Sequence, residues 1–332
     1  MNPSQEVEAN AAGVSTRLSE NLAFEVRCGL TTYPKWLPTS LLYDAVGSAL
    51  FQAITELPEY GLTAAEIRLL KQRALSIAAA IQPCRTLVEL GPGDGRKARI
   101  VVAAFLHLRS ELDYYAMDVS RSALEKTTRD LAAIPGLRAH GVEGSFVSLK
   151  ELPPSVHAGQ RCVMLLGSTL GNFGPDSRLA LLQSLRNCLN MGDWVLLGLD
   201  LIKPVSLLIA AYDDPIGVTA AFNRNVLVRL NREMGASFKP DCFRHKAVWS
   251  SLHSRMEMHL EALESCTVEI PAAECVAHFD RGETIHTESS YKFDPASLSG
   301  LAWDAGFEAA AQWEDASWPY TLVLWKARSF GR

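Results

Sequence analysis

The chain has 332 residues, which is long enough for one large domain or for a core domain with a smaller lobe. Apolar residues make up 48% of it and charged residues 21%, as is ordinary for a folded protein. Its formal net charge is −5 and its basic cluster, Arg96 to Arg99, is short, which argues against a nucleic-acid substrate. No apolar run approaches the length of a membrane span and the first residues are polar, so we expect a cytoplasmic protein with no membrane partner.

The first half of the chain alternates between strands and helices after a polar start. Residues Met1 to Ser19 are mostly small or polar and predict a flexible tail. Apolar runs predict strands at Thr86–Leu90, Asp113–Asp118, Leu137–Gly141, Arg161–Gly167 and Asp193–Asp200. Helical spacing predicts helices at Lys97–Leu108, Arg121–Ala133 and Asp176–Leu189. Such an alternation indicates a parallel sheet covered on both faces.

The second half of the chain breaks this rhythm. Between Ile202 and His286 the pattern predicts a helix at Val218–Met234 and strand-like segments at Ala247–Leu260 and Cys266–Glu269. The chain then ends with a predicted helix at Pro295–Ala305 and predicted strands at Glu308–Trp313 and Thr321–Ala327. This ending completes an α/β, Rossmann-like sheet of seven strands, as in class I methyltransferases, into which an α+β lobe is inserted.

The predicted helices and strands divide the chain into three parts. Residues 1–19 form the tail. On this fold we expect residues 64–201 and 287–332 to form the core, which in class I methyltransferases binds S-adenosylmethionine (SAM), and residues 20–63 and 202–286 to form a substrate-binding lobe. The seven cysteines are scattered without a CxxC pair, which argues against disulfides and a zinc site.

The glycine turn Gly91–Gly95, which follows the first core strand, is a candidate cofactor site. Glycine lacks Cβ, so the backbone of such a turn can approach a ligand at the carboxyl edge of the sheet. Asp118 closes the next strand and can accept from both ribose hydroxyls, and Ser145 and Phe146 would flank an adenine. Without further context, a mere tight turn with a helix-capping acid explains these residues about equally well. A nicotinamide site is less favoured because Arg96 stands where GxGxxG requires its last glycine.

The sequence resembles the histidine-specific Nα-methyltransferases of ergothioneine biosynthesis from about Leu30 to Lys326. The segments that carry the resemblance are Tyr43–Ser48 with Phe51, Leu57–Tyr60, Glu89–Gly91, Arg96-Lys97, Gly167–Phe173, Ala211–Asp214, Phe222–Asn225, Ile285–Ser290 and Lys292-Phe293. Each segment alone is a weak signal, but all of them in the family's order are specific.

The resemblance implies a role for each matched residue. The SAM site would be lined by Tyr43, Gly91, Gly93, Lys97, Asp118, Ser145 and Phe146. The α-amine and carboxylate of histidine would be held by Tyr60, Gly167, Asn172 and Tyr212, and its imidazole by Met258, Glu288 and Ser290. The family makes the trimethylated betaine of histidine (hercynine) by three transfers without a metal. We expect L-histidine as the small-molecule partner and a monomeric enzyme.

The chemistry of these residues suits methyl transfer to an amine, an in-line displacement that depends on holding the nitrogen lone pair in place. Tyr43, Tyr60 and Asn172 are the predicted catalytic residues, because a hydroxyl or an amide oxygen can accept from the amine. Tyrosine faces can stabilise the methylated cation by about 0.5–2 kcal/mol. Glu288 and Ser290 are two residues apart, so on a strand they would share a face and suit an imidazole.

Two departures and several alternatives stay open. The family usually has a second tyrosine and a proline after the Glu59-Tyr60 pair, where this chain has Gly61-Leu62-Thr63, and Ser145 stands where an acid is common. The tyrosines and Met258 would otherwise be core residues, Asn172 a helix cap, and Glu288 an exposed charge. A metal site of His253, Glu257, His259 and His286 lacks a closed ligand set. The competing functions are methylation of a tryptophan-like amine and non-catalytic SAM sensing.

Overall fold

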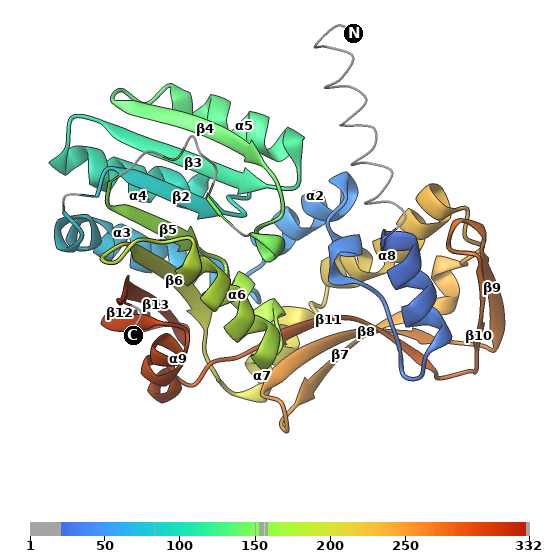
Figure 1. Cartoon of the computed structure of the whole chain (residues 1–332). Coiled ribbons are helices and arrows are strands. Elements are labelled where there is room, and N and C mark those ends of the chain that lie inside the picture. The colour runs from blue at the N-terminus through green and yellow to red at the C-terminus, as the bar shows by residue number, and fades with distance from the viewer. Residues whose placement is uncertain (1–20, 83, 150, 153–155, 157–158, 330–332) are drawn as a thin grey trace, which may run out of the picture. The chain divides into compact units, whose positions relative to one another are not determined.

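The computed structural model describes residues 21–329, apart from 83, 150, 153–155 and 157–158 (Figure 1). The predicted tail, Met1 to Ser19, lies outside the described residues. Contacts within the chain divide it into two compact units. Unit 1 comprises Met1–Tyr60 and Pro204–Ser289, and unit 2 comprises Gly61–Lys203 and Ser290–Arg332. Among the described residues no helix is both long and apolar enough to cross a bilayer.

Unit 2 is built on a seven-stranded sheet with the strand order β12-β13-β6-β5-β2-β3-β4. Its strands are β2 (Thr86–Leu90), β3 (Leu112–Asp118), β4 (Leu137–Glu143), β5 (Arg161–Leu165), β6 (Trp194–Asp200), β12 (Phe307–Glu314) and β13 (Tyr320–Ala327). All neighbours pair in parallel except β13, which is antiparallel to both β6 and β12. This arrangement confirms the predicted α/β class and the seven-stranded sheet.

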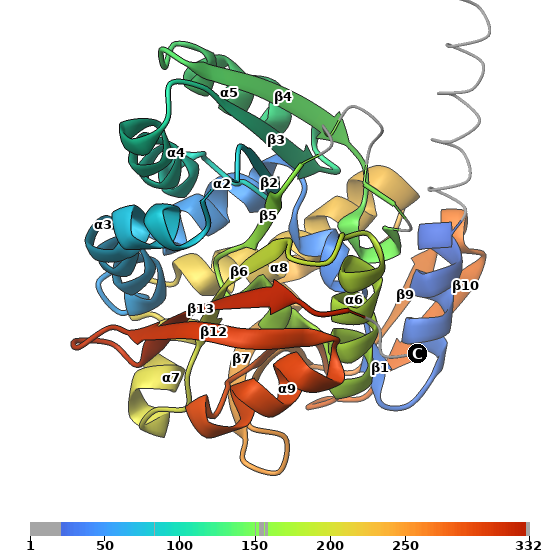
Figure 2. The ribbon, with the colours of Figure 1, turned by 60° about the vertical axis from the view of Figure 1, so that its left-hand side comes forward.

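Helices cover both faces of this sheet (Figure 2). One face carries α3 (Gly61–Ala80), α4 (Arg96–Leu108) and α5 (Arg121–Ala132), and the other carries α6 (Pro175–Asn187) and α9 (Leu298–Asp304). Three short 3-10 turns connect them: η2 (Phe146–Ser148), η3 (Thr169–Asn172) and η6 (Pro295–Ser297). The central strands β2, β5 and β6 are buried along their whole length, as their apolar runs predict.

The described part of unit 1 combines a four-stranded sheet, a hairpin and several helices. The sheet has the order β1-β11-β8-β7, with β1 (Lys35–Trp36), β7 (Phe243–Ser250), β8 (Arg255–Ala262) and β11 (Thr284–Tyr291, whose last two residues belong to unit 2). The hairpin pairs β9 (Cys266–Ile270) with β10 (Cys275–Phe279). The helices are α2 (Ala45–Ile54), α7 (Val205–Tyr212) and α8 (Val218–Met234), with the 3-10 turns η1 (Thr39–Leu42), η4 (Pro240–Cys242) and η5 (Pro271–Ala273). Residues 21–31 are also helical.

Two predicted elements differ from the structure. The strand-like segment Ala247–Leu260 is a hairpin, because the chain turns between β7 and β8 and Ser254 takes a positive φ of 48° there. The helix predicted at Pro295–Ala305 opens as the 3-10 turn η6, in which Asp294 accepts from the backbone N–H of Ala296. Local turn geometry of this kind is poorly encoded in hydrophobic periodicity.

Candidate active site

The glycine turn after β2 has the backbone that a close ligand approach requires. Gly91, Gly93 and Gly95 have positive φ values of 70°, 59° and 75°. A Cβ added at Gly93 would meet no atom within 4 Å, and one at Gly91 would lie 3.8 Å from the ring of Phe146. The turn therefore leaves open space beside the two glycines expected at the cofactor.

The carboxyl ends of β3 and β4 bring further predicted cofactor residues to the same edge of the sheet. Asp118 ends β3, where it accepts from the backbone N–H of Ser120 at 2.9 Å, and burial raises the pKa of its carboxyl. The N–H of Gly144 donates to the carbonyl of Asp118 at 3.0 Å, which fixes the start of the segment with Ser145 and Phe146. An acid and an aromatic ring beside a glycine turn fit a nucleoside.

Glu89, the residue that begins the Glu89–Gly91 motif, is fully buried on β2. The hydroxyl of Tyr114 donates to its Oε2 at 2.5 Å, while its Oε1 has no hydrogen-bond partner among the residues that the structure describes. Burial raises the pKa of Glu89 to about 7. A carboxyl group with this pKa directly before the glycine turn was not singled out from the sequence.

Lys97 and Gly167, predicted at the cofactor and the substrate respectively, meet at a buried acid. The carboxylate of Glu66, on α3, accepts from the Gly167 N–H at 2.8 and 2.9 Å and pairs with Lys97 Nζ at 3.1 Å. The hydroxyl of Tyr320 donates to the same carboxylate at 2.6 Å. A Cβ at Gly198 would lie 2.0 Å from Glu66 Oε1, so only glycine fits beside it. Glu66 therefore positions both predicted residues.

Glu66 was not predicted as a site residue, although its position in the sequence carries a signal. It lies four residues after Leu62 and four before Leu70, on the buried stripe of α3. An acid on the apolar stripe of a helix is rarely buried without a partner.

The motif Gly167–Phe173 forms a constrained turn after β5. Gly167 and Ser168 have positive φ values of 78° and 57°, and Ser168 accepts at its Oγ from the N–H of Asp200 at 3.0 Å. A Cβ at Gly171 would lie 2.8 Å from a backbone oxygen, so this glycine allows close packing. Asn172 ends η3 and is half-buried. The helix cap of α6 is Gly174, without a side-chain bond, so Asn172 does not serve as that cap.

In unit 1 the three predicted tyrosines belong to one aromatic cluster with two phenylalanines. Tyr43 packs edge-on against Phe51 and Phe222, with ring centroids 5.7 and 5.6 Å apart. Tyr60 packs against Phe51 at 6.2 Å and against Tyr212 at 6.3 Å. We call these five residues the aromatic cluster. It contains tyrosines assigned to the cofactor and to the substrate.

Glu288 lies at the edge of the aromatic cluster. Its side chain is buried, and its Oε1 accepts from the Tyr43 hydroxyl at 3.3 Å. Burial and the nearby Glu288 charge raise the pKa of Tyr43 well above its usual value, so the phenol stays protonated. Met258, on β8, is also buried. Glu288 is therefore not the exposed strand charge that a lone acid would suggest.

Unit 1 also contains a buried network of hydrogen bonds among polar side chains. The amide of Asn223 donates to His245 Nδ1 at 2.9 Å and accepts from the Thr287 hydroxyl at 2.7 Å. His245 Nε2 lies 2.8 Å from the carbonyl of Tyr212, which ends α7, so Nε2 carries the proton and Nδ1 accepts. Burial lowers the pKa of His245, which keeps its ring neutral. Asn223 thereby explains part of the Phe222–Asn225 motif.

Ser290, the first residue of the second stretch of unit 2, is buried and contacts an ionic cluster. Lys292 Nζ donates to Ser290 Oγ at 2.9 Å and to Asp200 Oδ2 at 2.9 Å. Lys203 pairs with Asp200 as well, and Trp318 donates to Asp200 Oδ1 at 3.2 Å. The division between the units falls between Ser289 and Ser290.

The departure at Gly61 has a structural explanation within unit 2. A Cβ at Gly61 would lie 2.3 to 2.7 Å from three ring atoms of Trp318. The indole therefore occupies the space that a larger residue at position 61 would need. Lys203 lies 4.5 Å from the centre of the same ring.

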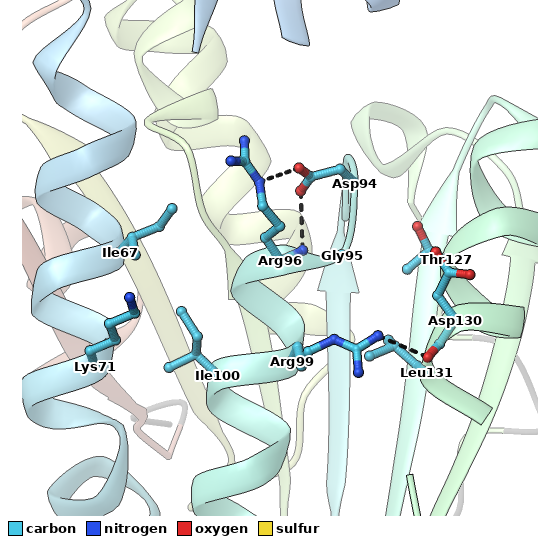
Figure 3. Close-up of a pocket in the computed structure, with 10 residues that line it drawn as sticks. All are labelled: Ile67, Lys71, Asp94, Gly95, Arg96, Arg99, Ile100, Thr127, Asp130 and Leu131. Atoms are coloured by element: carbon cyan, nitrogen blue, oxygen red, sulfur yellow. Dashed lines mark hydrogen bonds and ion pairs between the residues drawn. The ribbon is translucent and has the colours of Figure 1, made fainter. Parts of the chain in front are cut away.

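A cavity of about 510 Å³ lies among α3, α4, α5 and the end of the glycine turn (Figure 3). It is lined by Ile67, Lys71, Asp94, Gly95, Arg96, Arg99, Ile100, Thr127, Asp130 and Leu131. Asp94 and Gly95 belong to the glycine turn, but none of these residues was individually assigned to SAM or to histidine. Among these residues Arg96 pairs with Asp94, and Arg99 donates to the carbonyl of Asp130 at 2.9 Å. Within the described part of the chain, no group of three or more metal-ligating side chains is arranged to hold an ion.

Comparison with known proteins identifies the family. Residues 22–327 match the family model described as "Histidine-specific methyltransferase, SAM-dependent". The chain belongs to this family. It is 41% identical over 308 residues to "Histidine N-alpha-methyltransferase" of Mycolicibacterium smegmatis, covering 92% of this chain and 95% of that one. It is 40% identical over 304 residues to the Mycobacterium tuberculosis protein of the same name, covering 90% and 93%.

A more distant relative of this methyltransferase bears a different name. "4-Dimethylallyltryptophan N-methyltransferase easF" of Claviceps fusiformis is 25% identical over 343 residues, covering 94% of each chain. The family is SAM-dependent, and the open glycine turn with Asp118 and Phe146 fits that co-substrate.

Proposed function

We propose that the chain transfers methyl groups from SAM to the α-amine of free L-histidine, in three successive steps that give hercynine for ergothioneine biosynthesis. The family match over residues 22–327 and the names of the relatives at 40–41% identity support the substrate. The observation that carries the proposal is the buried carboxylate of Glu288, held by Tyr43 at the edge of the aromatic cluster.

Glu288 suits an imidazole because the ring has one N–H to donate and one nitrogen that accepts. We propose that its carboxylate accepts the ring N–H, that Ser290 serves the other nitrogen, and that Met258 packs against the ring. A site that buries such groups rejects rings that leave them unpaired. This requirement favours histidine over the tryptophan-like amine of the distant relative.

We propose that the tyrosines and Asn172 hold the reacting nitrogen. SAM supplies an electrophilic methyl carbon on its sulfonium. The amide oxygen of Asn172 accepts from the amine, while Tyr60, Gly167 and Tyr212 hold the amino-acid end of the substrate. Because the pKa of Tyr43 is raised, its hydroxyl acts as a donor and does not remove the amine proton. Water takes that proton.

The rings of the aromatic cluster can stabilise the substrate nitrogen in all three transfers. Each transfer removes an N–H from the nitrogen and makes its charge more permanent. Tyr60 and Tyr212, whose side chains are each 8% exposed, offer ring faces to that cation, worth about 0.5–2 kcal/mol.

At the co-substrate, we propose that Gly91, Gly93, Asp118, Ser145, Phe146 and Lys97 contact SAM, with Tyr43 adjoining it. We further propose that unit 1 is the substrate-binding lobe and that the enzyme needs no metal. The monomeric state and the cytoplasmic location expected from the sequence stay predictions.

The proposal is tested by mass spectrometry of the purified protein incubated with SAM and all twenty amino acids together. We expect histidine alone to gain mass, in steps up to three methyl groups. Methylation of a different amino acid would overturn the histidine assignment and leave the methyltransferase. SAM binding without any methylated product would favour the sensor. Product that stops at one or two methyl groups would overturn trimethylation alone.

A further inference from the structure

The side-chain amide of Asn223, on α8, has a fixed orientation in the interior of unit 1. Asn223 is 0% exposed. Its Nδ2 donates to the carbonyl of His259 at 3.0 Å and lies 2.9 Å from His245 Nδ1. Because a carbonyl can only accept, the amide nitrogen faces His259, and its second N–H is directed to His245. The amide oxygen then accepts from the Thr287 hydroxyl at 2.7 Å.

Through His245 this amide is connected to the end of α7. The last carbonyls of a helix have no partner within the helix. The carbonyl of Tyr212, the last residue of α7, lies 2.8 Å from His245 Nε2. This carbonyl can only accept, so Nε2 carries the ring proton and Nδ1 presents a lone pair to Asn223. The ring therefore links Asn223 to a residue that we propose to hold the amino-acid end of the substrate.

Through Thr287 the same amide is connected to the strands that carry the proposed imidazole residues. The Thr287 hydroxyl lies 2.9 Å from the carbonyl of Met258, on β8. Thr287 also directly precedes Glu288 on β11. Thr287 and Met258 are 1% and 2% exposed. Asn223 is thus hydrogen-bonded, through one side chain in each direction, to residues proposed for both ends of the substrate.

We propose that Asn223 is a positioning residue that sets the separation between the two ends of the substrate site, so that the site selects amino acids by the length of their side chain. The inference rests on the proposed function and deepens it. Histidine has a single methylene between its ring and Cα, and homohistidine has one more. A site with a fixed separation misplaces one end of the longer molecule, and a methylene is worth about 10–200-fold in such selection.

Asn231 provides a matched control further along α8. Its Nδ2 donates to the carbonyl of Phe238 at 2.8 Å, and its Oδ1 accepts from the N–H of the same residue at 2.9 Å. Phe238 lies in the loop after α8 and is not a proposed substrate residue. Asn223→Ala and Asn231→Ala each remove an amide that is hydrogen-bonded on both sides, but only the first removes the link between the proposed ends of the site.

The test measures, by calorimetry, the affinities of the complex with S-adenosylhomocysteine for histidine and for homohistidine. Their ratio does not depend on the amount of folded protein, which a merely structural role would change. We expect the wild type to favour histidine by at least about tenfold. Asn223→Ala should lower this ratio by about fivefold, because the two ends can then shift relative to each other, and Asn231→Ala should change it by less than about twofold.

An unchanged ratio in Asn223→Ala, or the same decrease in Asn231→Ala, would overturn the inference and leave the proposed function intact. A wild type that binds both amino acids equally would do so too. A wild type that neither binds nor methylates histidine would overturn the proposed function and the inference with it.

If Asn223→Ala does not fold, Thr287→Val and Thr287→Ser replace it. Valine keeps the branched shape without the hydroxyl, whereas serine keeps the hydroxyl that donates to Asn223. The ratio should fall by about fivefold in Thr287→Val and by less than about twofold in Thr287→Ser. Equal ratios in these two variants would also overturn the inference.

Discussion

The hydroxyl of Tyr43 donates to Oε1 of Glu288 at 3.3 Å, which links the end of η1 to strand β11 within unit 1. The family resemblance implies different ligands for these two residues, SAM for Tyr43 and the imidazole for Glu288. Their contact means that a change at one alters the hydrogen bonding of the other. Each can be probed through the affinity for its expected ligand.

Replacing Glu288 tests the imidazole assignment. We expect Glu288→Ala to lower kcat/KM for histidine by about a hundredfold or more, because it removes a charged acceptor from a buried site. SAM affinity should stay within about twofold. Steady-state kinetics and calorimetric titration with SAM give the two values. Equal losses for histidine and SAM would contradict the assignment.

Tyr43→Phe tests whether the phenol acts as a donor or as a base. Its pKa is raised by burial and by Glu288, so the hydroxyl stays protonated across about pH 6 to 9. We expect kcat/KM for histidine to fall about tenfold while the shape of its pH profile is unchanged. Tyr33→Phe, at an 87% exposed position, is the control for the substitution itself. Loss of a basic limb from the profile in Tyr43→Phe would show that the phenolate takes part.

Glu66→Gln tests how much the contacts of the buried Glu66 carboxylate with Gly167 and Lys97 stabilise the protein. An amide can present only one oxygen to three donors, so we expect a loss of about 2–4 kcal/mol in the free energy of unfolding. Tyr320→Phe removes a single hydrogen bond from the same carboxylate and should cost about 1 kcal/mol. Urea unfolding measures both values. Similar losses in the two variants would mean that the Lys97 and Gly167 contacts add little.

His286 makes stability depend on pH. Burial, and next the neighbouring His259, lower its pKa from 6.5 to about 4 in the folded protein. Between these pH values the unfolded chain binds a proton that the folded chain does not, so the free energy of unfolding falls as pH falls. The His286 contribution reaches about 3 kcal/mol. Urea unfolding from pH 7 to 4.5 should show a flatter decline in His286→Gln, and parallel curves would contradict this prediction.

The sheet of unit 2 was predictable because its strands carry a local signal. Thr86–Leu90 and Trp194–Asp200 are unbroken apolar runs, as expected of strands buried on both faces. The glycine turn was also visible, since only glycine adopts its backbone freely. The hairpin turn between β7 and β8 was missed because a short polar turn hardly alters the periodicity around it.

The supporting residues of the candidate site were not predictable from local pattern. Glu66 contacts Gly167 across 101 positions of sequence, and Asn223 contacts Thr287 across 64. No hydrophobic period records such pairs, and the family resemblance marks matched positions without saying what they touch. Lys292 was part of a matched segment, yet its partner Asp200 lies 92 positions away, as 292 − 200 shows.

The apolar core of the seven-stranded sheet draws its residues from unit 2, including Val88, Val163 and Leu197. The aromatic cluster belongs to unit 1, and the chain passes between the units at three points, after Tyr60, Lys203 and Ser289. On the proposed assignment of unit 1 to substrate binding, substitutions in the aromatic cluster would change substrate preference while the residues that stabilise the sheet stay as they are. For directed evolution, libraries at Phe51 and Phe222 would sample new amines without changing a residue of that core.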